Sequence, residues 1–286
     1  MSQSGEQIEE IKEQFDETAE RVARNPWVER LARFGFAAKG VVYITAGALA
    51  VLAALGQGGE VTDARGSMRS LARLPYGRPL LGVVAFGLVA YVLWRWVQSV
   101  TDADGKGRSW KGLAIRAGYF GSGTVYAGLS LTAARILFGA YDEGQPSAAQ
   151  SWTARLLSVP FGRWGVVLAG LGVLGFGGYQ IYKGWSLKFR KRLKLSTMGE
   201  AASGWATFSG RVGYIARGVV FIIIGLLLER AALTFDSSQA GGIDSALQTL
   251  ARSSLGMPAL LAVAAGLVAY GCYALVEARY RRIAGS

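Results

Sequence analysis

A cation, a glycine and an aromatic residue recur at fixed spacing at the start of three apolar stretches of this chain. The first copy contains Arg33, Lys39-Gly40, Tyr43 and Gly47. Arginine and lysine bind phosphate and carboxylate groups, whereas glycine lets two helices approach closely in a membrane. Two interpretations follow. Either the cations form a site for lipid headgroups or another anion, or the motif is a joint that packs the repeats together.

The motif returns twice with the same spacing. The second copy is Arg116, Gly118, Ser122-Gly123, Tyr126 and Ser130, and the third is Arg211, Gly213, Arg217-Gly218, Phe221 and Gly225. The candidate residues for an anion or lipid-headgroup site are Arg33, Lys39, Arg116, Arg211 and Arg217. The candidate packing stripe is Gly40, Tyr43, Gly47, Gly123, Tyr126, Gly218, Phe221 and Gly225. Because helical side chains lean toward the N-terminus, we expect Lys39 and Arg217 to extend back to the cytoplasmic interface.

The sequence contains few of the residues and motifs that are typical of catalytic sites. The chain has no histidine, no Gly-x4-Gly-Lys-(Ser/Thr) phosphate loop and no Gly-x-Ser-x-Gly elbow. A single cysteine, Cys272, excludes a disulfide framework and a cysteine metal cluster. The acids lie in the N-terminal segment, in loops or at helix ends. As the alternative to an anion site, Glu277 pairs with Arg33 or Arg211. We therefore expect neither an enzyme nor a cofactor or metal site.

Six apolar stretches are long enough to cross a bilayer, which takes about 20 residues. They are Phe34–Leu55, Leu80–Val100, Ala114–Phe138, Trp164–Trp185, Ser209–Leu228 and Ala259–Glu277. Of the 31 cations, 22 fall on the side that holds both termini. The positive-inside rule then places both termini in the cytoplasm and the protein in the inner, or plasma, membrane. The net charge of +12 is thus a topology signal, and we expect no nucleic-acid partner.

Residues 1–26 precede the first stretch and carry seven acids between Glu6 and Glu20. Apolar residues at spacings of three and four predict an amphipathic helix here. This helix is either solvated or docks on a protein partner, which includes a second copy of the chain.

Three similar units follow, at 27–105, 106–195 and 196–286. In each, the first membrane helix leads to a short amphipathic stretch and then to a corner rich in Pro and Gly. The returning helices share a second stripe of four positions: Gly87, Tyr91, Trp94 and Gln98; Gly172, Phe176, Tyr179 and Lys183; Gly266, Tyr270, Tyr273 and Glu277. The pattern predicts an all-α membrane protein of three tandem hairpins with pseudo-threefold symmetry, in which the short helices lie at the membrane interface.

This organisation resembles a bacterial membrane family catalogued only as a domain of unknown function. The resemblance covers about residues 27–282 and implies no activity, substrate or cofactor. We expect a non-enzymatic protein that acts as a scaffold or binds lipids or partners. The alternative is a channel or carrier for a small solute through the repeat interface, since the plan is similar to that of mitochondrial carriers.

The predicted orientation can be tested with a reporter enzyme that is active only in the periplasm. Fused after Ser286, the reporter should be silent, because the positive-inside rule keeps that end in the cytoplasm. The same reporter inserted in the loop that precedes the second apolar stretch serves as the positive control. Activity of the fusion after Ser286 would overturn the orientation.

Overall fold

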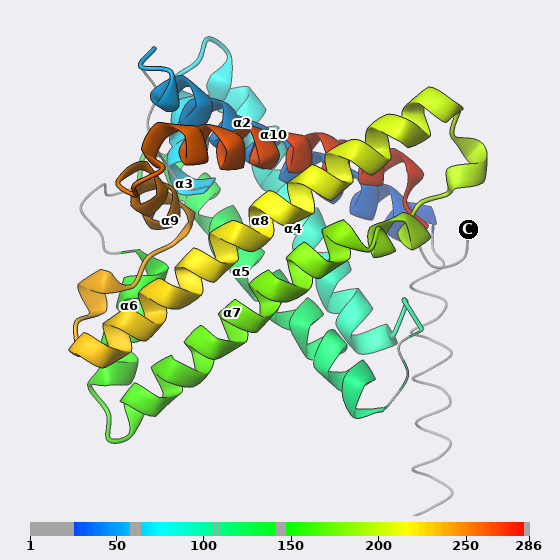
Figure 1. Cartoon of the computed structure of the whole chain (residues 1–286). Coiled ribbons are helices and arrows are strands. Elements are labelled where there is room, and N and C mark those ends of the chain that lie inside the picture. The colour runs from blue at the N-terminus through cyan, green and yellow to red at the C-terminus, as the bar shows by residue number, and fades with distance from the viewer. Residues whose placement is uncertain (1–25, 58–63, 106, 108, 141–146, 283–286) are drawn as a thin grey trace, which may run out of the picture.

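The computed structural model describes residues 26–57, 64–105, 107, 109–140 and 147–282. All but the last residue of the acidic segment 1–26 lies outside these residues, so its expected helix is not tested. The described chain is all-α (Figure 1). Its long helices are α2 (Pro26–Ala54), α4 (Gly77–Thr101), α5 (Trp110–Leu137), α7 (Gly162–Trp185), α8 (Glu200–Thr234) and α10 (Gly256–Tyr280). Its short helices are α3 (Ala64–Ala72), α6 (Ala148–Leu157), α9 (Ile243–Ala251), η1 (Lys188–Arg192), η2 (Leu195–Thr197) and η3 (Ser237–Gln239).

Five of the long helices, α2, α4, α7, α8 and α10, are long and apolar enough to cross a membrane. The remaining one, α5, has 28 residues but is diluted by glycine, serine and threonine, so that it is less apolar than the others. The apolar helices identify a membrane protein, and the sixth span stays a prediction. Both α2 and α8 begin well before the apolar stretches that predicted them.

Each predicted short amphipathic stretch forms a helix that leads into a corner. α3 buries Met68 and α9 buries Leu247 against their neighbours. In the first two corners the left-handed residue is aromatic, with φ of 61° at Tyr76 and 63° at Phe161. The glycine that follows each of them does not adopt the left-handed conformation. It is required because the preceding short helix leaves no room for a side chain there. A Cβ at Gly77, for example, would run into the carbonyl oxygen at the end of α3.

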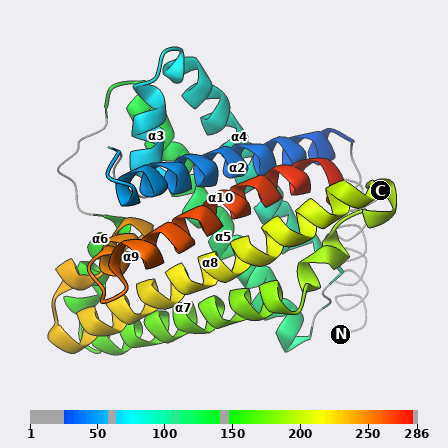
Figure 2. The same cartoon turned by 45° about the horizontal axis from the view of Figure 1, so that its top comes forward.

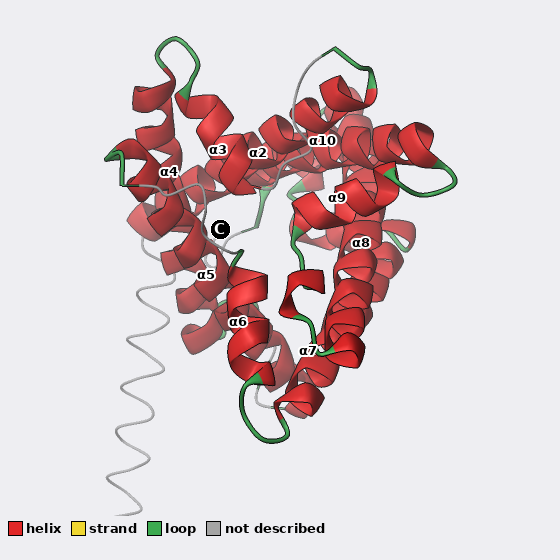
Figure 3. Ribbon diagram, turned by 90° about the vertical axis from the view of Figure 1, so that its left-hand side faces the viewer, coloured by secondary structure: helices red, strands yellow, loops and turns green. Residues whose placement is uncertain are grey.

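The long helices form an incomplete ring. α2, α10, α8 and α7 lie side by side in that order, and α4 and α5 continue the ring from α2 (Figure 2). Figure 3 looks at the end of the bundle where α3, α6 and α9 lie. The opposite end, which we call the basic end, is where α4, α7 and α10 finish and η1 follows α7. Two apolar clusters fill the body, one around α8, α9 and α10 and one around α2, α3 and α4.

Glycines bring neighbouring helices into backbone contact. A Cβ on Gly40 would lie 2.9 Å from the Gly271 carbonyl oxygen of α10, and one on Gly271 would lie 2.7 Å from the Gly40 oxygen. Gly218 of α8 and Gly177 of α7 form the same reciprocal pair. The first helix of a repeat thus packs on the returning helix of another repeat. Such small-residue contacts allow the van der Waals packing that drives helix association in lipid.

The second repeat differs from the other two in its internal packing. α2 packs on α4 and α8 packs on α10, whereas α5 and α7 make no extended contact with each other. In the first repeat a Cβ on Gly35 would collide with Tyr91, and in the third a Cβ on Gly213 would collide with Tyr270. The equivalent glycine of α5, Gly118, meets nothing within 4 Å. Strict equivalence of the three hairpins is therefore not observed, and pseudo-threefold symmetry is not established.

The reciprocal glycine pair gives a direct test of the packing. Gly177→Val should lower the free energy of unfolding by about 1–3 kcal/mol, because the added side chain overpacks the α7–α8 contact. Gly178→Val, one residue along the helix and facing open space, is the matched control and should have little effect. Chemical denaturation in detergent measures both. Equal stability of the two variants would contradict the role assigned to this contact.

Candidate functional site

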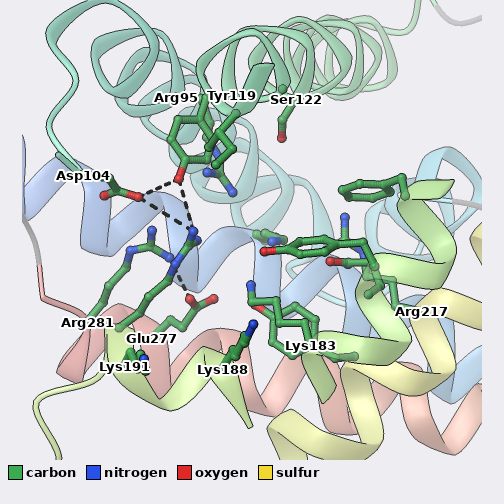
Figure 4. A pocket seen from close by; sticks show the side chains of 18 of the residues that line it. Arg95, Asp104, Tyr119, Ser122, Lys183, Lys188, Lys191, Arg217, Glu277 and Arg281 are labelled. Carbon is green, nitrogen blue, oxygen red and sulfur yellow. Dashed lines mark hydrogen bonds and ion pairs between the residues drawn. The ribbon is translucent and has the colours of Figure 1, made fainter. Parts of the chain in front are cut away.

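A cavity of about 910 Å³ lies between helices of all three repeats at the basic end (Figure 4). Nine cationic side chains line it: Lys39, Arg95, Lys183, Lys188, Lys191, Arg192, Arg217, Arg281 and Arg282. Two carboxylates, Asp104 and Glu277, accompany them. The cavity is therefore strongly cationic. Its volume is in the range of ordinary small-molecule pockets, which is about 300–1,000 Å³.

Lys39 projects from α2 into a cage of four tyrosine rings. Its ammonium nitrogen lies 4.9 to 6.0 Å from the ring centres of Tyr43, Tyr91, Tyr126 and Tyr270. It donates a hydrogen bond of 2.7 Å to the Tyr270 hydroxyl, and the side chain is 2% exposed. The expectation that Lys39 extends out to the interface was wrong. Cation–π contacts and a phenol hydrogen bond hold the charge inside the bundle instead.

Arg217, the counterpart of Lys39 in the third repeat, turns toward the same centre. Its guanidinium lies over the rings of Tyr43 and Phe221, and it donates a 2.6 Å hydrogen bond to the Tyr270 hydroxyl. The expected extension of Arg217 to the interface was also wrong. One phenol thus accepts from two cations, and the second-repeat counterpart, Ser122, lines the cavity without a charge.

Among the buried and partly buried cations of the cavity, four donate only to phenol or amide oxygens of the described residues. Besides Lys39 and Arg217 these are Lys183, which donates to Tyr214 at 2.8 Å, and Arg95, which donates to Tyr91 and Gln98. Within the described residues, none of the four forms an ion pair. A buried charge without a counter-charge is costly, so this arrangement is suited to an anion.

The two carboxylates of the cavity are already engaged. Glu277 forms a buried ion pair of 2.7 Å with Arg281, the residue that directly follows the end of α10. Its expected pairing with Arg33 or Arg211 was therefore wrong. Asp104 accepts a 2.7 Å hydrogen bond from Tyr119 and lies 3.9 Å from Arg192. Burial opposes the charge of Arg192, but Tyr119 and Asp104 raise the pKa of this guanidinium above its usual value.

The other three cations of the predicted anion site lie outside the cavity lining. Arg33 donates to the Ala278 and Arg279 carbonyl oxygens at the end of α10, and it pairs with Glu29 at 2.6 Å. Arg116 donates in the same way to the Ser99 and Val100 carbonyl oxygens at the end of α4. Arg211 lies over the ring of Trp185, the last residue of α7. A cation at a helix C-terminus satisfies free carbonyls and the helix dipole.

The members of the predicted packing stripe divide by residue type. The glycines lie at helix contacts: Gly40 and Gly47 face α10, Gly123 faces Trp96 of α4, and Gly218 and Gly225 face α7. The aromatic members lie around the central cations. Phe221, for example, forms an edge-to-face pair with Phe176 at 4.9 Å and lies beneath Arg217. One stripe therefore supplies both the helix contacts and part of the site lining.

Sequence reasoning did not assign the returning helices to the site. Tyr91, Lys183, Tyr270 and Glu277 all belong to the repeated stripe of those helices, and all take part in the cavity or in its hydrogen bonds. The signal was present, because a polar residue ends this stripe in each repeat. Arg95, Asp104, Tyr119, Arg192 and Arg281 follow no repeat pattern, and only the fold brings them together.

The family model described as Domain of Unknown Function (DUF1206) matches the chain three times, at residues 34–102, 117–186 and 212–281. The chain belongs to this family. The DUF1206 chain is 37% identical to the Uncharacterized protein YxxB of Bacillus subtilis (strain 168) over 258 residues, which cover 90% of this chain and 93% of that protein. No solved structure matches. The three matches confirm the resemblance inferred from the repeated motif.

The shared phenol at the centre of the site can be tested by substitution. Tyr270→Phe removes an acceptor from Lys39 and from Arg217, and should cost about 1–3 kcal/mol in the free energy of unfolding. Tyr43→Phe is the matched control. It keeps a ring beside both cations and removes a hydroxyl that has no partner among the described residues. Denaturation in detergent should separate the two variants, and equal stability would contradict the proposed hydrogen bonds.

Proposed function

We propose that this DUF1206 protein binds an anion, a phosphate or carboxylate group, in the cationic cavity between its three repeats. The observation that carries the proposal is the absence of any ion pair for Lys39, Arg95, Lys183 and Arg217 within the described residues. Ionisable groups inside a membrane bundle are costly, and they mark binding sites or transport paths. A bound anion supplies counter-charge beyond that of Glu277 and Asp104, which pair with Arg281 and Arg192.

The surroundings favour an anion over a neutral solute. Lys39 and Lys183 are buried, with 2% and 7% of their surfaces exposed, and their hydrogen bonds go to phenols that carry no charge. Each ammonium group has three donors, so both retain donors for a ligand. Lys188 and Lys191 of η1 line the same cavity and add positive charge at its edge. Phosphate and carboxylate oxygens accept several such bonds at once.

The proposed setting is an inner, or plasma, membrane protein with six spans, including α5, and both termini in the cytoplasm. The basic end then faces the cytoplasm, where anionic headgroups and soluble phosphates are abundant. The role is binding rather than catalysis, and membrane lipids are the nearest partners. The acidic N-terminal segment remains a candidate contact for a protein partner or a second copy, and nucleic acid is not a partner.

The second candidate function is a channel or carrier. The location of the polar cavity among helices of all three repeats favours it, because a path through the repeat interface would begin in such a cavity. Uptake of radioactive phosphate into sealed proteoliposomes would support this alternative over binding alone.

Anion binding can be measured directly on the protein in neutral detergent. Titration with inorganic phosphate, followed by calorimetry, should give saturable binding. Lys183→Gln should weaken it by about ten- to a hundredfold, because a charge-assisted hydrogen bond contributes about 1.5–3 kcal/mol. Arg211→Gln is the matched control, since it removes a cation outside the cavity lining. Absence of phosphate binding, or equal affinity in both variants, would contradict the proposal.

A further inference from the structure

We propose that the anion is the headgroup of an amphiphile whose alkyl chain leaves the cavity between α5 and α7. This inference rests on the proposed anion site and names the class of ligand: a phosphate or carboxylate that carries an acyl or alkyl chain. The two helices belong to the second repeat, and together with the cavity they provide a polar compartment joined to an apolar exit.

The second repeat lacks a glycine contact that holds the two helices together in each of the other repeats. In the first repeat a Cβ on Gly87 would lie 2.5 Å from Ala38, and the equivalent glycine of the third repeat, Gly266, would collide with Ala216. Their counterpart on α7 is Gly172, and the residue at the matching place on α5 is Gly121. Neither meets any atom within 4 Å. The positions that hold the two helices together in the other repeats are thus glycine on both helices of the second repeat, and there they make no contact with each other.

This opening is continuous with the cationic cavity. Ile115 of α5 and Phe176 and Tyr179 of α7 line the cavity, yet their exposed fractions are 41%, 43% and 52%. Side chains that line a cavity and are also exposed at the molecular surface mark the mouth of that cavity. An apolar mouth between two helices of a membrane protein admits a hydrocarbon chain at little cost, because the chain remains in an apolar environment.

Three polar groups near the mouth can donate hydrogen bonds to a ligand. Gln180 of α7 is 3% exposed and lines the cavity, and its amide nitrogen has no hydrogen-bond partner among the described residues. A buried donor without a partner costs about 1–3 kcal/mol. Lys183 lies one turn further along α7, and the Ser122 hydroxyl lies across on α5 (Figure 4). These three groups place hydrogen-bond donors beside the apolar exit, as a headgroup with an attached chain requires.

The lack of charge at Ser122 fits the same ligand. The equivalent residues of the other repeats, Lys39 and Arg217, fill the centre of the bundle with long cationic side chains. A third long cation at Ser122 would occupy the passage from the cavity to the space between α5 and α7. The short hydroxyl leaves that passage free and still provides a hydrogen-bond donor.

The test compares dodecyl phosphate with inorganic phosphate on the full chain in neutral detergent. The double variant Gly121→Leu/Gly172→Leu adds bulk to α5 and α7 at the positions that close the other two repeats, and neither position lines the cavity. It should weaken dodecyl phosphate binding by about tenfold or more, because the leucines displace at least two methylene groups of the chain. Binding of inorganic phosphate should not change. Gly178→Leu is the matched control. Position 178 is two residues beyond Phe176, which lines the cavity, and at about 100° per residue it therefore lies on the opposite side of α7.

The outcomes separate the two proposals. If inorganic phosphate binds and the double variant leaves dodecyl phosphate binding unchanged, the amphiphile proposal is overturned and anion binding stands. If neither ligand binds to the unaltered protein, both proposals fail. The double variant can also lose binding of both ligands while its unfolding midpoint is unchanged. In that case the alkyl chain has no exit separate from the anion site, and the amphiphile proposal fails.

A second measurement locates the chain without filling the space. In a Cys272→Ser background, a bimane fluorophore is attached at Gly121→Cys or, as the control, at Gly178→Cys. Dodecyl phosphate brominated near its tail should quench the first probe saturably, and the second only in proportion to its concentration in the micelle. Equal, unsaturable quenching at both positions would overturn the proposal.

Discussion

Direct contact between helix backbones is the constraint on which this structure depends. Lipid offers apolar side chains no hydrophobic gain, so the helices associate through close packing, which glycine permits. The reciprocal pairs Gly40–Gly271 and Gly177–Gly218 bring α2 onto α10 and α8 onto α7. These contacts aim the residues one position before Gly40 and Gly218 toward the middle of the bundle. Lys39 and Arg217 are therefore placed at the centre by the same turns of helix that form the joints.

The central cations need an environment that tolerates charge without neutralising it. Tyrosine provides this in two ways, through the face of its ring and through its hydroxyl. Lys39 has four such rings around it, and Tyr270 accepts from both Lys39 and Arg217. Carboxylates in these places would pair with the cations and close the site to anions. The carboxylates that are present are held apart by their own partners, as Glu277 is by Arg281.

The sequence predicted the helices better than the site. The period of the motif was enough to predict three tandem repeats, each with a short helix between two long ones, because these depend on which residues share one helix face. A helical wheel does not show which neighbour that face meets, or how far the helix extends. α8 begins at Glu200, nine residues before the apolar stretch, so Arg217 lies deep in the bundle rather than near its edge. The partner of Glu277 was also missed, although Arg281 follows it by only four residues, because the helix ends between them and directs the arginine back onto the carboxylate.

Several departures from the repeat pattern lie on α5 and α7, the two helices of the second repeat. The second repeat has Ser122 in place of a cation, Phe176 in place of tyrosine, and Gly121 where the others have alanine. Each change removes bulk or a polar group from α5 or α7, and these two helices make no extended contact. A symmetric ring of three tight hairpins would enclose its cations without access. Because α5 and α7 make no extended contact, the ring of helices is open on one side. The divergence of the second repeat therefore gives the cavity an apolar mouth.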